Sequence, residues 1–376
     1  MIYLDNASTT YVYPEVIEKI YDILKNNWGN PSNIYSFGFK SKEIIDGARI
    51  TIAKCIGAKP ENIFFTSGSS EGNAWALKQG TKCLCSPYEH HNITENANSI
   101  IADEDYLERT LNQDWTTKSY LKQEYKNWVY SHMLVSNETG EIFDVNPLFE
   151  QAKQLGMFTH CDMTQAIGNI PIYMNKFPNV DMATFSGHKV HAPKGIGFAY
   201  ISDKVLEKHY DESKPEFYIK PLIYGGIQER NLRAGTENIA YIAGLALAVD
   251  RATSEGMLKN VTCGHLRQFA KQKLNDSNLD YYIVEGEHNI PSTFTFCLKN
   301  VESEVIQSML SEKDIFIGTG SACGDGTMSV SETLKYMEVP IEYIHGEIRL
   351  SFDLSTTEED IDKAIDTIKK CYEQLQ

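Results

Sequence analysis

The sequence predicts an α/β fold: a large domain with a mainly parallel sheet flanked by helices, joined to a smaller α+β domain. Up to about residue 250, short apolar runs alternate with helical patterns, as in a parallel sheet. Polar residues collect directly after several of these runs, at the sheet edge where such folds bind ligands. From about Arg251 the pattern changes to helices and short strands. We therefore expect a large domain over 14–250 and a small domain formed by 1–13 and 251–376.

The first part of the chain predicts two helices and then a strand that runs into a small-residue turn. Pro14 suits a first helical turn, and a second helix is expected over about 40–56. The apolar run 62–66 leads into Ser67-Gly68-Ser69-Ser70 and a further helix. Because free N–H groups at a helix start favour an anion, this turn is a candidate phosphate site. A plain serine cap is the alternative.

Three further apolar runs, 127–135, 157–161 and 180–185, are predicted strands, and each is followed by polar side chains. The last run ends in Ser186-Gly187-His188-Lys189. A lysine beside a hydroxyl and an imidazole can bond to an aldehyde cofactor such as pyridoxal phosphate, whereas a lone loop lysine is usually just solvated. The residues expected at strand ends are Ser69, Ser70, Asn137, Asp162, Gln165, His188 and Lys189. This set as a whole favours a functional role for Lys189.

The small domain carries two further candidate residues. Cys323 lies in the glycine-rich stretch 318–326, which cannot build much core, so its thiol is expected to be exposed and is a candidate nucleophile. Arg349 lies inside a strand-like run, where it forms a structural ion pair or binds a substrate carboxylate. In the last helix, Thr356 and Glu359 have the spacing of a capping box.

Composition excludes several classes of protein. The net charge of −16 argues against a general nucleic-acid-binding surface. No apolar run approaches the length of a membrane span, and the first residues do not resemble a signal peptide. The eight cysteines are scattered, which favours reduced thiols and a cytoplasmic location. Cys83 and Cys85 alone are too few for a metal site, so no metal is expected.

Several motifs together resemble the cysteine desulfurases of the NifS/IscS type, which belong to the class V aminotransferases of fold type I. The resemblance runs nearly from end to end. Its motifs are Tyr3-Leu4-Asp5-Asn6-Ala7-Ser8-Thr9-Thr10, Gly29-Asn30-Pro31-Ser32, Thr66-Ser67-Gly68, Glu89-His90, Asn137-Glu138, Asp162 with Gln165, Ser186-Gly187-His188-Lys189, Glu229-Arg230 with Arg233-Ala234-Gly235-Thr236-Glu237-Asn238, and Gly320-Ser321-Ala322-Cys323. The sequence after Cys323 departs from the usual family pattern.

The resemblance implies roles around a pyridoxal 5'-phosphate cofactor. Lys189 would hold the cofactor covalently and later move protons. Asp162 would pair with the pyridinium nitrogen, Gln165 with the phenolate oxygen, and His90 would stack on the ring and transfer protons. The phosphate would be bound by Ser70, Ser186 and His188, with backbone help from Ser69, and by Thr236 of a partner subunit in a homodimer.

The resemblance also implies the reaction. Asn137 and Arg349 would hold the carboxylate of L-cysteine, and Cys323 would attack its sulfur, leaving a persulfide on Cys323 and releasing L-alanine. A sulfur-acceptor protein, either a scaffold or a thiolation enzyme, would follow. Iron–sulfur assembly, tRNA thiolation and DNA phosphorothioation are all open destinations. Another class V reaction (aminotransfer, selenocysteine lysis or β-elimination) is the alternative, and a sulfur carrier with little turnover is a third.

Overall fold

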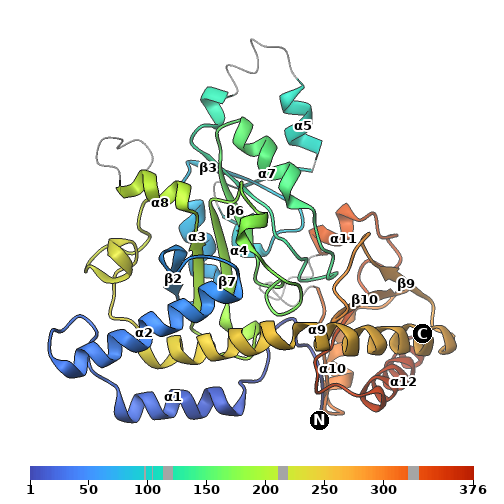
Figure 1. The fold of residues 1–376 in the computed structure, drawn as a ribbon. Coiled ribbons are helices and arrows are strands. Elements are labelled where there is room, and N and C mark those ends of the chain that lie inside the picture. The colour runs from blue at the N-terminus through green and yellow to red at the C-terminus, as the bar shows by residue number, and fades with distance from the viewer. Residues whose placement is uncertain (97–98, 104, 113–121, 211–218, 321–329) are drawn as a thin grey trace. The chain divides into compact units, whose positions relative to one another are not determined.

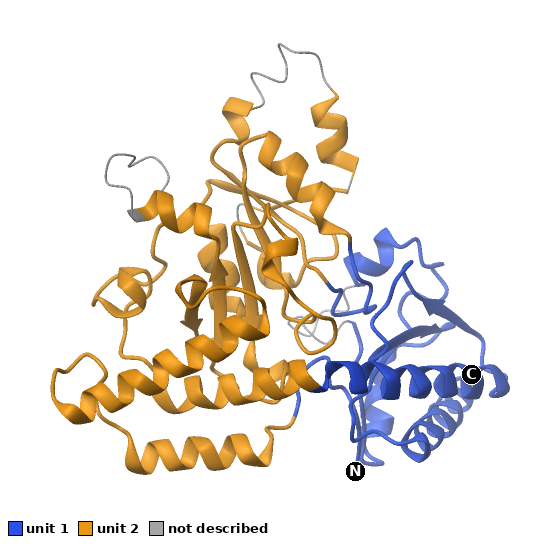
Figure 2. Ribbon diagram, in the orientation of Figure 1, with its two compact units in different colours: residues 1–10, 135–143, 255–376 blue, residues 11–134, 144–254 orange. Residues whose placement is uncertain are grey.

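The computed structural model describes residues 1–96, 99–103, 105–112, 122–210, 219–320 and 330–376. Figure 2 shows the chain as two compact units. Unit 1 contains residues 1–10, 135–143 and 255–376, and unit 2 contains residues 11–134 and 144–254. Cys323 and the rest of 321–329 lie outside the described residues.

Unit 2 is built on a seven-stranded sheet in the order β2-β8-β7-β6-β5-β3-β4. Its strands are β2 (Ile63–Thr66), β3 (Lys82–Cys85), β4 (Ser99–Ile101), β5 (Trp128–Ser131), β6 (Phe158–Asp162), β7 (Met182–Ser186) and β8 (Gly197–Ile201). The strands from β7 to β4 pair in parallel, while β8 is antiparallel to both β7 and β2. The expectation of an α/β fold with a mainly parallel sheet is confirmed.

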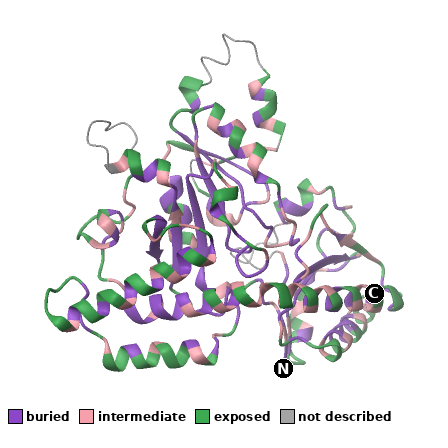
Figure 3. Cartoon of the chain, in the orientation of Figure 1, coloured by how far each residue is buried: buried purple, intermediate pink, exposed green. Residues whose placement is uncertain are grey.

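Helices flank this sheet (Figure 1). They are α1 (Pro14–Asn26), α2 (Ser36–Cys55), α3 (Ser69–Leu77), α4 (His91–Thr94), α5 (Asp105–Leu111), α7 (Val145–Gln154) and α8 (Asp203–Tyr210), with short 3-10 turns at Pro60–Asn62, Met174–Lys176, Gly187–Lys189 and Gln228–Asn231. Helix α3 packs on β6, β7 and β8, and α7 packs on β6. Except for the edge strand β4, the strands are almost wholly buried (Figure 3), because both faces of a parallel sheet are covered.

Unit 1 contains a three-stranded antiparallel sheet and a two-stranded parallel pair. The sheet has the order β12-β10-β9, and β1 pairs with β11. The elements are β1 (Ile2–Leu4), β9 (Tyr281–Val284), β10 (Thr293–Leu298), α10 (Ser303–Ser311), β11 (Ile315–Ile317), α11 (Glu332–Tyr336), β12 (Glu347–Ser351) and α12 (Glu358–Leu375). One apolar core joins these strands to the buried stripe of α12.

The apolar run 239–249 in the sequence predicts a helix that ends near Val249, but helix α9 (Ile239–Asp276) extends well beyond it. It is continuous over 38 residues, and its residues are divided between the two units. Its later part places Cys263, Leu266 and Ala270 in the core of unit 1 at helical spacing. The charged residues after Val249, such as Asp250 and Arg251, therefore lie within the helix and do not mark its end.

The cap of α12 lies one residue later than expected. Thr357 is the N-cap, its hydroxyl oxygen accepts from Asp360 N at 3.2 Å, and the Asp360 carboxylate accepts from Thr357 N at 2.9 Å. Thr356 instead closes the preceding turn, where its hydroxyl accepts from Asp353 N at 3.0 Å. Within the described residues, no helix is both long and apolar enough to cross a membrane.

Candidate active site

The carboxyl ends of the sheet strands in unit 2 gather several of the polar residues that the sequence singles out. Asn137 is an exception, because β5 ends at Ser131 and residues 135–143 belong to unit 1. Asp162 is the last residue of β6, and Ser186 is the last residue of β7. His90 follows β3 and is the N-cap of α4. Lys189 ends the 3-10 turn that follows β7. These strands are parallel, so the four residues leave the sheet at one edge.

Asp162 is a buried carboxylate that neutral donors hold in place. It is 6% exposed, Oδ2 accepts from Asn73 Nδ2 at 2.8 Å, and Oδ1 accepts from Thr164 N at 2.9 Å. No cation in the described part of the chain forms an ion pair with it. Since a buried charge without a counterion is costly, this position suits a cationic ligand atom such as a pyridinium N–H.

The two imidazoles at this edge are held neutral. Burial lowers the pKa of His90, the positive charge of Lys189 lowers it further, and the negative charge of Asp162 raises it. Burial, with the charges of Lys189 and Lys194, lowers the pKa of His188 to about 4. His90 Nδ1 accepts from a backbone N–H of α4 at 3.2 Å, so the neutral ring carries its proton on Nε2.

The turn from β2 into α3 forms an anion cradle. Gly68, with φ of 154°, is the N-cap of α3 and has no side chain to cap the first-turn N–H groups. A Cβ on Gly68 would lie 3.6 Å from Ser186 Oγ, so the end of β7 lies close to this helix start. Ser69 is half-buried and Ser70 is exposed in the first turn. Backbone donors, hydroxyls and the positive helix end together suit a phosphate.

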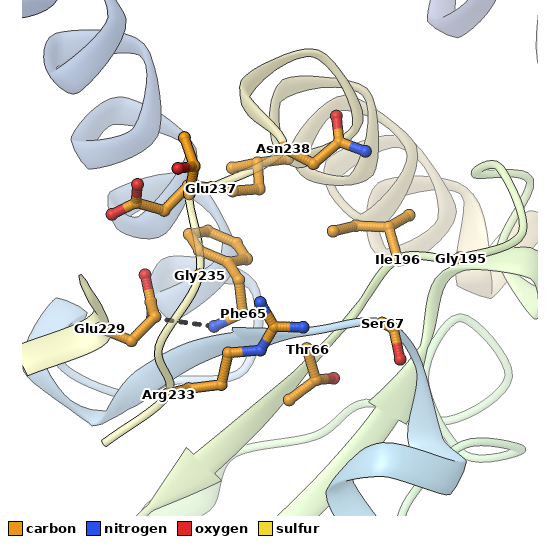
Figure 4. A pocket seen from close by; sticks show the side chains of 12 residues that line it. Phe65, Thr66, Ser67, Gly195, Ile196, Glu229, Arg233, Gly235, Glu237 and Asn238 are labelled. Carbon is orange, nitrogen blue, oxygen red and sulfur yellow. Dashed lines mark hydrogen bonds between the residues drawn. The ribbon is translucent and has the colours of Figure 1, made fainter. Parts of the chain in front are cut away.

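A cavity of about 250 Å³ lies beside this turn (Figure 4). Thr236 lines it and is exposed. Arg233 ties the lining loop to α3, because its Nε donates to Glu71 Oε1 at 2.8 Å and Glu71 Oε2 accepts from Ser67 N at 2.8 Å. The cavity thus adjoins the phosphate cradle.

Glu229 anchors the other end of the same loop, a role that the sequence motifs do not reveal. Its carboxylate is paired with the Arg49 guanidinium at 2.6 and 2.9 Å and accepts from Phe65 N at 2.9 Å, the bond drawn in Figure 4. Glu229, Arg230 and Asn231 have positive φ values of 44°, 57° and 67°. Such backbone is costly for residues with a Cβ, and the buried ion pair helps to hold it.

In unit 1 the structure brings Arg349 and Asn137 together. Arg349 is buried on β12, its Nη1 donates to the backbone oxygen of Asn137 at 2.7 Å, and its Nη2 donates to Asp5 Oδ1 at 2.9 Å and Ser8 Oγ at 2.7 Å. Arg349 therefore does form a structural ion pair. Its Nε has no acceptor among the described residues, which leaves a donor for a further anion.

Glu347 precedes Arg349 by two residues on β12, so both point to the same face. It is 3% exposed, and its Oε1 has no partner within the described residues. Burial, assisted by the negative charge of Glu138 and opposed by Arg349, raises the pKa of Glu347 to about 8. This carboxyl group is therefore largely protonated at neutral pH.

The described cysteines behave as structural residues. Six of them are buried, and Cys55 is half-buried on α2. Burial raises the pKa of Cys161 and of Cys297. Neither thiol is exposed and readily ionised, as a nucleophilic cysteine must be. Cys323 therefore remains the candidate nucleophile. No group of three or more possible metal ligands occurs in the described ranges.

Sequence reasoning missed the polar residues that lie behind Asp162. Asn73 comes from α3, and its Oδ1 accepts from the Thr184 hydroxyl on β7. His160, two residues before Asp162 on β6, contacts the same hydroxyl through Nε2 at 3.1 Å. The sequence does contain a signal for these residues. His160 lies two positions before Asp162 on a buried strand, so both side chains share a face, and a buried polar side chain needs a hydrogen-bond partner.

Comparison with known proteins gives matches over the whole chain. The family model described as Aminotransferase class-V matches residues 2–364. Proteins named cysteine desulfurase IscS from Dictyoglomus turgidum and Methanosarcina thermophila are 32% and 33% identical, over 100% of this chain and 95% and 93% of theirs.

Solved structures agree with this match. A NifS-like protein from Rickettsia africae is 27% identical, covers 99% of each chain and has a TM-score of 0.83. A structure described as SspA in complex with cysteine, 23% identical with a TM-score of 0.74 over 95% of this chain and 100% of that one, shares the fold. The expected family resemblance and the fold type I architecture are confirmed.

Proposed function

Because the chain belongs to the aminotransferase class-V family, whose enzymes depend on pyridoxal phosphate, we propose that it is a cysteine desulfurase. It would convert L-cysteine to L-alanine and leave a persulfide on Cys323. Full-length similarity to proteins named cysteine desulfurase supports this activity. The single structural observation that carries the cofactor assignment is the buried Asp162, held by neutral donors beside Lys189 and His90.

We propose that unit 2 binds pyridoxal 5'-phosphate. When bound, this group supplies an electron sink that makes the α-carbon proton of an amino acid removable. Asp162 would hold the ring nitrogen in its protonated form, and Gln165, which is also buried, would donate to the ring oxygen. The phosphate would lie at the start of α3 with Ser69, Ser70, Ser186 and His188.

Lys189 and His90 are the groups that would hold and move protons. Lys189 would also bind the cofactor covalently. His90 keeps a proton on Nε2 while its Nδ1 is occupied, so the ring presents one defined donor. The low pKa of His90 keeps this imidazole neutral near pH 7.

We propose that Arg349 and Asn137 bind the substrate carboxylate and that Cys323 is the nucleophile. The Cys323 thiolate would attack the substrate sulfur. A sulfur–sulfur bond forms as the carbon–sulfur bond breaks, and the electron pair stays with the carbon, which takes up a proton to become alanine. The persulfide then carries neutral sulfur to an acceptor protein, which we expect to be an iron–sulfur scaffold or a thiolation enzyme.

A homodimer fits two features of unit 2. Thr236 is exposed beside the phosphate cradle, where a second copy could use it. Helices α1 and α2 also expose large apolar side chains, including Tyr21, Leu24 and Phe39 at 64, 59 and 51%. We further propose a cytoplasmic location, because a chain with this many free thiols suits a reducing compartment.

The test is to supply L-cysteine and a thiol reductant and to measure alanine and sulfide. Cys323→Ala is expected to abolish both while leaving the visible absorption of the bound cofactor intact. Cys55→Ala, at a half-buried cysteine, is the matched control and should keep full activity. Alanine and sulfide formation that survives in Cys323→Ala would contradict the proposal, and amino-group exchange with an oxo acid would favour an aminotransferase.

A further inference from the structure

A line of buried polar side chains crosses the sheet of unit 2 behind Asp162. It starts at Glu89, whose Oε1 lies 2.6 Å from Ser131 Oγ on β5. Ser131 Oγ lies 2.8 Å from Nδ1 of His160 on the neighbouring strand β6. Ser131 and His160 are both 0% exposed, and Glu89 is 6% exposed. Water therefore has little access to these contacts.

The line continues from His160 to Asp162. His160 Nε2 lies 3.1 Å from Thr184 Oγ1, and the Thr184 hydroxyl donates to Asn73 Oδ1. Asn73 Nδ2 donates to Asp162 Oδ2 at 2.8 Å. The amide orientation of Asn73 follows from its partner, because only its NH₂ group can face a carboxylate. Thr184 and Asn73 are both 0% exposed.

The direction of these hydrogen bonds can be worked out from Asn73 backwards. Asn73 Oδ1 uses the only hydroxyl hydrogen of Thr184, so Thr184 must accept from His160 Nε2–H. A neutral His160 then has a bare Nδ1, which takes the hydroxyl hydrogen of Ser131. No hydrogen is left for the contact between Ser131 and Glu89. The missing hydrogen must come from a protonated Glu89 or from a doubly protonated His160.

The surroundings favour the proton on Glu89. His160 is wholly buried, and burial lowers its pKa to about 4 although the charge of Asp162 opposes this. Ser131 is the one side chain among the described residues that lies within hydrogen-bond distance of the Glu89 carboxyl group, through Oε1, and Oε2 is buried without a partner of good geometry. Asp162, by contrast, accepts two hydrogen bonds and so is the better place for negative charge.

The charges near Glu89 act in the same direction. Burial raises the pKa of Glu89 well above its usual range and the charges of Asp162 and Cys85 raise it further, whereas hydrogen bonds from Ser131 and from the backbone of His90 oppose this rise without cancelling it. The titratable groups around Glu89 are Asp162, Cys83, Cys85, Cys161, His90 and His160. None of these is a lysine or an arginine that would favour an ionised Glu89.

We propose that Glu89 is a positioning residue: as a neutral acid it begins a one-directional line of hydrogen bonds that ends on the Asp162 carboxylate and holds it ionised and oriented. If Glu89 were ionised, Ser131 would turn towards it, His160 would move its hydrogen to Nδ1, and Thr184 would turn from Asn73 to His160. Asn73 Oδ1 would then lose its donor. The role of Asp162 towards the cofactor rests on the function proposed above, whereas the proton on Glu89 does not.

The first test needs neither cofactor nor substrate. Infrared spectra of the full chain labelled with ¹³C-glutamate should contain a protonated carboxylic acid band that is absent from Glu89→Gln. Glu347 supplies a separate band, so Glu347→Gln is the matched control and should keep the Glu89 band. If Glu89→Gln loses no carboxylic acid band, or if nitrogen NMR shows both nitrogens of His160 protonated at neutral pH, the proposal is wrong.

The second test compares two substitutions of similar size. Glu89→Gln keeps a donor towards Ser131, whereas Glu89→Met does not. Glu89→Met is expected to weaken binding of pyridoxal phosphate about tenfold and to shift the pH midpoint of its visible absorption by about one unit. The reason is that leaving a buried polar group without a hydrogen-bond partner changes an equilibrium constant by about a factor of ten. Glu89→Gln should change the affinity less than about threefold.

Both variants are first checked for native circular dichroism, and two further substitutions separate a fold defect from loss of the line. Thr184→Val breaks the line at another contact and should reproduce the spectral shift of Glu89→Met, whereas Thr184→Ser should restore the wild-type midpoint. Equal shifts in Glu89→Gln and Glu89→Met, or no shift in Thr184→Val, would overturn the proposal. A chain that shows the expected shifts but forms no alanine would contradict the desulfurase assignment alone.

Discussion

The candidate sites in unit 2 and unit 1 each contain a buried charge, but only the charge in unit 1 is balanced by an ion pair within the described residues. In unit 2, Asp162 is buried and accepts only from neutral donors, so its charge is not balanced by an ion pair within the described residues. In unit 1, Arg349 is equally buried, but Asp5 pairs with its guanidinium at 2.9 Å. The difference suggests that Asp162 is built to receive a cationic atom of a tightly held ligand. Arg349 is already balanced and suits a ligand that enters and leaves.

Removing the unbalanced charge of Asp162 should have the largest effect on cofactor binding. Asp162→Asn should lower the affinity for pyridoxal phosphate about a hundredfold, because hydrogen bonds to charged groups contribute about 1.5–3 kcal/mol and each 1.4 kcal/mol is a factor of ten. The measurement is an absorbance titration of the cofactor-free chain. Asp203→Asn, at an aspartate of the same unit whose side chain is 45% exposed, is the control and should bind normally. Binding by Asp162→Asn within threefold of wild type would break the comparison.

A substitution of Arg349 should weaken substrate binding and leave cofactor binding unchanged. Arg349→Lys keeps the charge but loses the forked donors to Asn137 O, Asp5 and Ser8. We expect KM for L-cysteine to rise about tenfold with unchanged cofactor affinity, since one charged hydrogen bond contributes about 1.5 kcal/mol. Steady-state alanine formation measures KM, and absorbance titration measures the cofactor affinity.

The matched control is Arg267→Lys, because Arg267 is another buried arginine of unit 1 and is paired with Glu285 at 2.7 Å. Both variants should be destabilised by about 1–3 kcal/mol, but only Arg349→Lys should raise KM. An equal KM effect in the two variants would show that loss of stability, not loss of a substrate contact, explains the result.

The two units also contain buried groups with opposite pH behaviour. His160 in unit 2 titrates at about 4 when folded and near 6.5 when unfolded, so its share of the stability is present above pH 6.5 and lost as the pH falls towards 4. Glu347 in unit 1 titrates at about 8 when folded and near 4.3 when unfolded, so its share is present below pH 4.3 and lost as the pH rises towards 8.

Urea unfolding at pH 5 and pH 7 can separate these contributions. Relative to wild type, His160→Gln should gain about 2 kcal/mol on going from pH 7 to pH 5, and Glu347→Gln should gain about 2 kcal/mol in the opposite direction. Parallel pH trends in the two variants would contradict the assigned protonation states.

The smallest expected effect is on the free energy of unfolding, and it comes from the N-terminal cap of helix α12 in unit 1 and not from a buried charge. Asp360→Ala should lower the free energy of unfolding by about 0.5–1 kcal/mol, because Asp360 completes the capping box of α12 with Thr357. Glu359→Ala should have almost no effect, although the sequence pairs Glu359 with Thr356. Thermal unfolding distinguishes the two, and a larger loss in Glu359→Ala would favour the register expected from sequence.

The capping box of α12 shows what a sequence pattern can and cannot predict about a helix start. Two consecutive threonines each have an acidic residue three positions later, so the pattern predicts a helix start without fixing which threonine begins it. Likewise, polar residues after apolar runs correctly place Asp162 and Ser186 at strand ends, because the alternation of strands and helices determines which edge of a parallel sheet they reach.

The partners of Asp162 could not be predicted in this way. Asn73 reaches Asp162 from α3, and Thr184 lies opposite it on β7, which is a matter of strand register and helix packing. A buried polar residue shows that a partner must exist but does not say which one. Residues 135–143 also group with unit 1 by contacts between distant parts of the chain, which local patterns do not encode.

The most direct test of the role of Asp162 is nitrogen NMR of the chain loaded with pyridoxal phosphate that carries ¹⁵N in its ring. We expect a protonated ring nitrogen in the wild-type chain at neutral pH and loss of that proton in Asp162→Asn. A ring nitrogen that is unprotonated in the wild-type chain, or one that keeps its proton in Asp162→Asn, would contradict this role.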